Sequence, residues 1–159
     1  MRQNRFITDY LLAEFATQKK QHEWRGASSS LKQLIKNKFN VDLSKSNIDD
    51  GSGISRLNLL TVNQLDSFLS VVSKKSNFAS TKSLMAIPRE ECTLRDRFKD
   101  VTELYVKTGS LSNVSALVGY FYDKRRELHS FVIMSNNFFG DHEPYRGLEE
   151  AIISIVAAK

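Results

Sequence analysis

Cysteine, proline and glycine are all scarce in this sequence, and each shortage excludes a class of protein. The 159 residues include 1 Cys, 2 Pro and 7 Gly. A single cysteine cannot form a disulfide within the chain or build a multi-cysteine metal cluster. So few prolines and glycines also exclude a chain dominated by loops. The longest apolar candidate, residues 151–158, is far shorter than the ~20 residues of a membrane-spanning helix, and residues 1–12 lack a signal-peptide pattern.

The composition that remains is that of a globular protein. Hydrophobic residues make up 41% and charged residues 26% of the chain, and a chain of this length buries roughly 70% of its unfolded surface. The net charge is +5, but the lysines and arginines occur in short groups beside polar or acidic residues, as on a solvated surface. We therefore expect no nucleic-acid partner. A basic surface that binds nucleic acid is the alternative that the charge leaves open.

The first half of the chain has the apolar spacing of three helices. Residues 7–15 carry apolar side chains at helical intervals, and a loop at residues 24–26 is expected to follow. Serines 28–30 are candidate N-caps for a second helix. Thr61 and Gln64 have the spacing of a capping box, which predicts the start of a third helix.

The second half changes to the spacing of strands. Residues 104–106 predict a short strand, and residues 115–122 are apolar at nearly every position, as in a strand buried on both faces. A charged connection at 123–127 leads to a third predicted strand at 129–135. This order favours an antiparallel hairpin.

A helix is expected to end the chain. Pro144 suits a first helical position. Glu149 and Glu150 are expected in the opening turn, where carboxylates favour the helix dipole. The predicted buried stripe consists of Leu148, Ile152, Ile155 and Val156.

The segment Lys107-Thr108-Gly109-Ser110 follows the first predicted strand and could bind a carboxylate. Lysine supplies a positive charge, the two hydroxyls supply donors, and Gly109 leaves room for an extended substrate along a strand edge. A plain β-turn with an exposed lysine is the alternative for the tripeptide taken alone.

Four segments together resemble D-alanyl-D-alanine carboxypeptidases of the low-molecular-mass class C penicillin-binding type. In the family's order they are DGSGISRLN (50–58), TLRDRF (93–98), KTGSL (107–111) and VSALVGY (114–120). The resemblance implies an α+β fold, the C-terminal part of a penicillin-binding, serine β-lactamase-like transpeptidase domain. Helices would precede a three-stranded antiparallel sheet segment and a C-terminal helix. Residues 1–159 would then be a single partial domain.

The resemblance also implies an acyl-serine enzyme that removes the terminal D-alanine from peptidoglycan stem peptides. Lys107 would hold the substrate carboxylate and tune the electrostatics, and Thr108 and Ser110 would bind that carboxylate through their hydroxyls. The Ser110 backbone N–H would be one oxyanion donor. Gly109 completes the substrate-binding set. No metal or organic cofactor is implied.

Two motifs of the family are not matched. Its nucleophilic serine belongs to an SxxK motif far upstream, and the literal match Ser29-Ser30-Leu31-Lys32 falls where the family has an ordinary helix. We therefore expect the nucleophile to be absent from this chain and the chain to be inactive alone. The SxN motif is broken as well, with Asn4 as its uncertain remnant.

Partners and location follow from the resemblance. Peptidoglycan stem peptides and β-lactams are the expected ligands, in the periplasm or cell envelope. A complementing N-terminal fragment, or self-association through an open strand edge, is expected to complete the fold. The alternative function is a non-catalytic remnant or a module that binds peptidoglycan or protein.

Other polar and aromatic residues give weaker signals. Asp141-His142-Glu143 is expected to be an exposed loop rather than a metal site, and His129 has no ligand partner at a recognisable spacing. Phe138-Phe139 is expected to anchor the last connection to the core.

Overall fold

The computed structural model describes residues 5–18, 24–88, 94 and 96–159. The chain divides into two compact units, Arg2–Val71 and Val72–Lys159, and each is described by itself. The sequence prediction of one partial domain spanning 1–159 stays a prediction. None of the described helices combines the length and apolar character that a membrane span requires.

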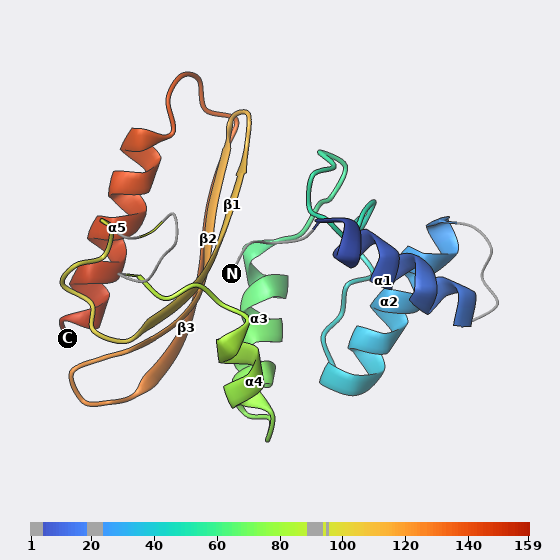
Figure 1. Ribbon diagram of the computed structural model, residues 1–159, viewed down its shortest axis with the longest axis horizontal. Helices are drawn as coiled ribbons and strands as arrows, with labels where there is room; N and C mark the ends of the chain where they lie inside the picture. Colours follow the sequence, from blue (N-terminus) through green and yellow to red (C-terminus); the bar gives the residue numbers. More distant parts are fainter. Residues whose placement is uncertain (1–4, 19–23, 89–93, 95) are drawn as a thin grey trace. The chain divides into compact units, whose positions relative to one another are not determined.

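The first unit is built on a pair of helices, α1 (Arg5–Gln18) and α2 (Trp24–Phe39) (Figure 1). Their contact is a small apolar cluster in which Leu12 is 6% and Ala27 0% exposed, with Leu31 packed against them. The expected loop at 24–26 is wrong, because α2 already begins at Trp24. Burial of Ala27 against α1 requires a helical turn at that point, and this tertiary contact outweighs the capping preference of the serines that follow.

The third helix, α3 (Val62–Ser73), begins where the capping box predicts. The Thr61 backbone N–H donates to Gln64 Oε1 at 3.0 Å, and the Gln64 N–H donates to Thr61 Oγ1 at 3.2 Å. The two bonds satisfy donors that a helix start leaves without partners within the helix. The prediction is confirmed in its start and its mechanism.

The second unit contains an antiparallel sheet of three strands in the order β1-β2-β3. They are β1 (Leu104–Leu111), β2 (Val114–Tyr122) and β3 (Leu128–Asn136), and the predicted hairpin is confirmed. The first strand is longer than its predicted extent at 104–106. Lys107 pairs with Val118 and Ser110 with Ser115, so the apolar strand β2 holds the KTGS residues extended.

Helix α5 (Glu143–Ala157) covers one face of this sheet (Figure 1). The predicted stripe of α5 is wrong at two positions, because Leu148 is 53% and Ile155 64% exposed. Ile153 packs into the core instead, with the buried residues Leu94, Phe98, Val101, Leu104, Val106, Leu117, Phe121 and Phe131. Pro144 lies in the first turn as expected, but the acidic residue there is Glu143.

The opposite face of the sheet is covered by aromatic contacts from the short helix α4 (Phe78–Ser83). The Phe78 ring meets the fully buried Tyr120 ring edge-on at 4.8 Å. Strand β2 is therefore buried on both faces, as its composition predicts. Its Gly119 has no room for a side chain, because a Cβ would lie 2.0 Å from the Tyr105 carbonyl oxygen.

Candidate active-site strand and its pocket

The KTGS segment, Lys107–Ser110, lies at the outer edge of β1. The Val106 N–H and C=O bond Ala86 at 2.9 and 2.8 Å, and not β2. Because backbone groups alternate in direction along an antiparallel strand, those of Thr108 and Ser110 point to the same outer edge. Among the described strands, β1 pairs only with β2, so an extended chain could add to the sheet at this edge.

The side chains of the KTGS segment divide between the two faces of the sheet. Thr108 and Ser110 continue the row of Leu104 and Val106, which pack on the α5 side, and Lys107 projects from the other face. Lys107 is exposed, and its Nζ donates to the Thr108 carbonyl oxygen at 2.6 Å. The ammonium group therefore lies at the outer edge, close to the backbone that a bound chain would follow.

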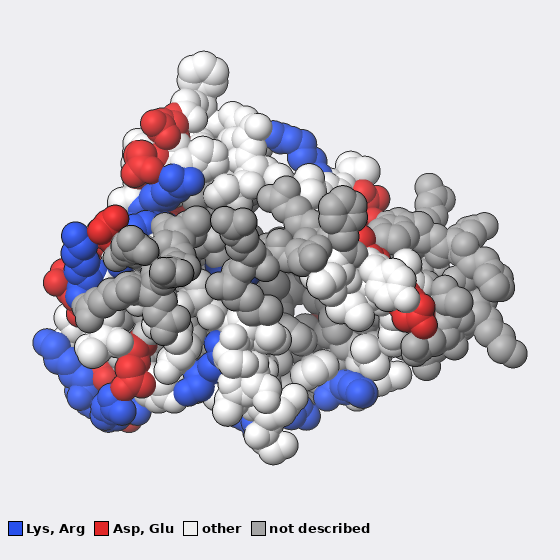
Figure 2. Space-filling view, in the orientation of Figure 1, with Lys and Arg blue, Asp and Glu red and all other residues white. Residues whose placement is uncertain are grey.

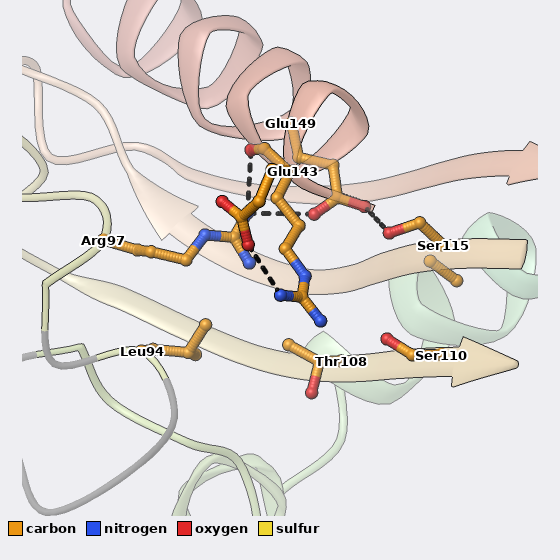
Figure 3. A pocket seen from close by; sticks show the side chains of 9 residues that line it. Leu94, Arg97, Thr108, Ser110, Ser115, Glu143 and Glu149 are labelled. Atoms are coloured by element: carbon orange, nitrogen blue, oxygen red, sulfur yellow. Dashed lines mark hydrogen bonds and ion pairs between the residues drawn. The ribbon is translucent and has the colours of Figure 1, made fainter. Parts of the chain in front are cut away.

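A pocket of about 450 Å³ opens beside this segment, between β1, β2 and the start of α5 (Figure 3). We call it the α5 pocket. Its polar lining comes from the KTGS hydroxyls of Thr108 and Ser110, from Ser115, and from two arginines and two glutamates. The full lining is Leu94, Arg97, Thr108, Ser110, Ser115, Ala116, Glu143, Arg146 and Glu149.

The wall of the α5 pocket holds a buried carboxylate that the sequence prediction missed. Glu149 is 2% exposed, and its two oxygens bind Arg97 Nη2 at 2.9 Å and Ser115 Oγ at 2.7 Å (Figure 3). Arg97 also donates to the Arg146 carbonyl oxygen at 2.9 Å. The predicted place of Glu149 in the opening turn is therefore wrong. Arg97 and the Ser115 hydroxyl bind both carboxylate oxygens, and this is why Glu149 can face the sheet although it is charged. Arg97, in the TLRDRF segment, is the sequence feature that could have indicated a buried carboxylate partner.

Gly109, predicted to leave room for substrate, is not required by the packing of the described residues. A Cβ at Gly109 would touch only the Ala116 Cβ, at an ordinary 3.6 Å. Its role in substrate binding stays a prediction.

The DGSGISRLN segment forms a tight loop in the first unit, and we call residues 49–58 the Asp50 loop. One Asp50 oxygen accepts the N–H groups of Gly53 and Asn58 Nδ2, each at 2.7 Å, and the other accepts the Ser55 N–H at 2.7 Å. The Asp50 carboxylate thereby closes the loop on its own backbone. Partial burial raises the pKa of Asp50, but hydrogen bonds from Asn58, Ser55, Gly53 and Ser52 outweigh it and lower the pKa below 3.8.

The Asp50 loop is attached to α1 by a second carboxylate. The Gly51 N–H donates to Asp9 Oδ1 at 2.9 Å, and a Cβ at Gly51 would lie 2.5 Å from the Thr8 carbonyl oxygen. This motif of the resemblance therefore serves local structure in the unit Arg2–Val71.

The SxxK look-alike behaves as part of an ordinary helix. Ser29 is exposed in the middle of α2, and Lys32 Nζ donates to the Ser46 carbonyl oxygen at 2.6 Å. The Lys32 ammonium group thus fastens α2 to the loop that follows it. Asn4, the expected remnant of SxN, lies outside the described residues.

The residues that follow β3 meet one expectation and contradict another. Phe138 is 6% exposed and stacks on Tyr145 with ring centroids 3.8 Å apart. It anchors the connection as expected, whereas Phe139 is 98% exposed and anchors nothing. His142 lies just before α5 with its ring edge-on to Phe138.

One group of potential metal ligands occurs among the described residues, at the β2–β3 turn. Asp123, Glu127 and His129 have ligand atoms within 4.8 Å of one another. His129 Nε2 lies 3.0 Å from Asp123 Oδ2, so His129 does have a partner that its sequence spacing did not reveal. The Glu127 N–H donates to Asp123 Oδ1 at 2.8 Å. The Glu127 and His129 bonds lower the pKa of Asp123 and close the hairpin.

Comparison with known proteins decides the family. The family model of the D-Ala-D-Ala carboxypeptidase 3 (S13) family matches residues 2–159. The chain belongs to this S13 family. The resemblance drawn from the four segments is thereby confirmed. A search of the curated proteins finds no match.

Solved structures show the same fold. Penicillin-binding protein 4 from Haemophilus influenzae, in complex with a β-lactam, matches at a TM-score of 0.87 and 22% identity, over 98% of this chain and 39% of that chain. The Bd0816 predatory endopeptidase from Bdellovibrio bacteriovorus, in complex with an immunity protein, matches at 0.74 and 17%, over 97% and 40%. The S13 chain thus spans about two fifths of each, and the predicted α+β class is confirmed.

Proposed function

We propose that this chain forms the KTG-bearing wall of a serine-type D-Ala-D-Ala peptidase. The observation that carries the proposal is the open outer edge of β1, where the backbone of Thr108 and Ser110 faces outward beside a polar pocket. A peptide ending in D-Ala-D-Ala would lie along this edge as an added strand. The S13 family membership supplies the reaction class.

Ser110 would act at the reacting carbonyl of that peptide. Its N–H points to the outer edge, where it can donate to the oxyanion that forms when a serine Oγ attacks the carbonyl carbon. The C–N bond then breaks, the D-alanine leaves as an amine with a proton, and water releases the acyl group from the serine. Preorganised N–H donors commonly contribute ~2.7 to 4 kcal/mol to such a step.

Lys107 would supply positive charge at the same edge. Its Nζ already lies within 2.6 Å of the Thr108 carbonyl oxygen, so little rearrangement is needed to place the charge beside a bound chain. The charge would attract the peptide carboxylate and stabilise negative charge in the transition state. Thr108 and Ser110 would add hydroxyl donors from the α5 side.

The nucleophilic serine would come from a segment other than Ser29–Lys32, because Lys32 is bound to the Ser46 carbonyl oxygen. We propose that the partner is a complementing fragment that carries SxxK and SxN. The second candidate partner is another copy of this chain, bound through the outer edge of β3. β-Lactams would bind at the same place as the peptide. The proposed location is the periplasm or cell envelope.

Benzylpenicillin tests the enzyme proposal. The chain alone should gain no mass after prolonged incubation, because no activated serine is expected to face Lys107. Together with a fragment encoded by the upstream DNA that contains SxxK, it should give an adduct of one drug molecule. An adduct on Ser29 of the chain alone would contradict this assignment of the nucleophile, and stop codons upstream would support the remnant instead.

A non-catalytic role is the second candidate. The same open edge and pocket could bind a peptidoglycan peptide without chemistry. On the face that Figure 2 draws, basic and acidic side chains are interspersed over α5 and its neighbouring loops, so this face does not favour a nucleic-acid surface. Peptide binding with no adduct in any mixture would favour the binding module.

A further inference from the structure

Two arginines line the α5 pocket, and they differ in what holds them. Arg97 is 17% exposed and pairs at 2.9 Å with Glu149, which is buried. Arg146 is 40% exposed and pairs at 2.8 Å with Glu143, whose side chain is 72% exposed. An exposed pair three residues apart on a helix contributes little free energy. Arg146 can therefore exchange Glu143 for another carboxylate at low cost, whereas Arg97 cannot leave Glu149.

The charges of the α5 pocket allow one added anion to bind, because only Arg146 can give up its present partner. The charge of Glu149 is balanced by Arg97 and by the Ser115 hydroxyl, which donates at 2.7 Å. Glu143 is the remaining acid, and its exposed side chain can turn toward solvent. Once Glu143 turns away, the pocket offers the Arg146 guanidinium on the same side of β1 as Thr108 and Ser110.

We propose that Arg146 binds the C-terminal carboxylate of the D-Ala-terminated peptide, together with Thr108 and Ser110. This assignment rests on the proposed function, because it requires the peptide to lie along β1. A guanidinium presents two parallel N–H donors to a carboxylate. Lys107 projects from the opposite face of the sheet, so Arg146 supplies the positive charge on the α5 side. Because Glu143 must release the Arg146 guanidinium before the peptide carboxylate can bind it, Glu143 competes with the substrate.

The test is a titration of the isotope-labelled chain followed by amide chemical shifts. The probes are diacetyl-L-lysyl-D-alanyl-D-alanine and the same peptide with a C-terminal amide. The acid peptide should shift the amide signals of Thr108 and Ser110. Arg146→Gln should weaken its binding about tenfold and leave the weaker binding of the amide peptide unchanged, because only the acid offers a charged partner.

Two further variants sharpen the test. Glu143→Gln removes the competing carboxylate and keeps Arg146, so it should tighten binding of the acid peptide about two- to threefold. Arg125→Gln, at an exposed arginine in the β2–β3 turn, is the matched control for net charge and should leave both affinities unchanged. A well-dispersed amide spectrum of each variant shows that the fold is kept.

The outcomes separate the two proposals. The role of Arg146 alone is overturned if the acid peptide binds at Thr108 and Ser110 and Arg146→Gln leaves its affinity unchanged. It is also overturned if Arg146→Gln weakens the acid peptide no more than the amide peptide. Unchanged acid affinity in Glu143→Gln also counts against it. If neither peptide shifts these signals in the unaltered chain, the peptide-binding strand itself is wrong, and the role of Arg146 fails with it.

Discussion

The Asp50 loop and the KTGS segment are both dense in polar groups, yet they use them in opposite ways. Asp50 turns its two oxygens inward and collects N–H donors from its own loop. Along β1 the backbone of Thr108 and Ser110 faces an outer edge that no other described strand covers. Satisfied polar groups stabilise a structure, and outward-facing ones are available to a ligand. Both segments match the same family, so the match alone could not separate these roles.

The largest effect is expected at Glu149, behind the KTGS segment. Glu149→Ala removes the buried carboxylate that Arg97 contacts at 2.9 Å and leaves this largely buried guanidinium with only the more exposed and more distant Glu150 carboxylate, at 3.8 Å. We expect a loss of about 3 to 5 kcal/mol in the free energy of unfolding. Urea unfolding measures it, with Glu143→Ala as the control at an exposed acid of the same helix. Equal losses in both variants would show that the buried pair is not special.

Alanine substitutions at Gly119 and Gly109 compare a tightly packed position of the sheet with an open one. Gly119→Ala should destabilise the fold by about 3 kcal/mol, because its Cβ overlaps the Tyr105 carbonyl oxygen of the neighbouring strand. Gly109→Ala places its Cβ in ordinary contact with Ala116, so the melting temperature should barely change. If the Gly109 variant melts as early as the Gly119 variant, the KTGS segment is under structural constraint after all.

Asp50→Ala and Lys107→Ala compare the two motifs directly. Loss of the Asp50 carboxylate leaves several N–H groups of its loop without an acceptor and should cost about 2 kcal/mol of stability. Lys107→Ala removes an exposed side chain and should cost less than about 0.5 kcal/mol. With a complementing fragment, however, Lys107→Ala should cripple activity far more than Lys124→Ala. A destabilised Lys107 variant would place that lysine among the structural residues.

The smallest expected effect is a dependence on pH. Hydrogen bonds hold the pKa of Asp50 below 3.8, so its stabilising contribution is complete above the unfolded value, near 3.9, and is lost as the pH falls through the folded value. The difference in stability between the unaltered chain and Asp50→Asn should stay constant from pH 7 to 5 and shrink below about pH 4. A difference that grows on acidification would reverse the assigned direction.

Much of the element order could be predicted because it depends on local patterns. The start of α3 follows from a capping box of two side chains, Thr61 and Gln64, three residues apart. The three strands follow from a change of apolar period. Predictions failed where a distant partner decides, as at the start of α2, where Ala27 packs on α1, and in α5, where Arg97 allows Glu149 to turn inward.

The sequence by itself determined the S13 family, the α+β class and the KTGS segment, because each is written in residues close together along the chain. Only the tertiary structure decided which face of β1 carries Thr108 and Ser110, and that Arg97, Arg146 and Glu149 line the pocket beside them. The physical reason is that a strand alternates its side chains and a helix rotates them by about 100° per residue. If α5 were rotated by one residue, the exposed Leu148 would take the buried place of Glu149. The ion pair of Glu149 with Arg97, distant in the sequence, fixes which of the two residues is buried.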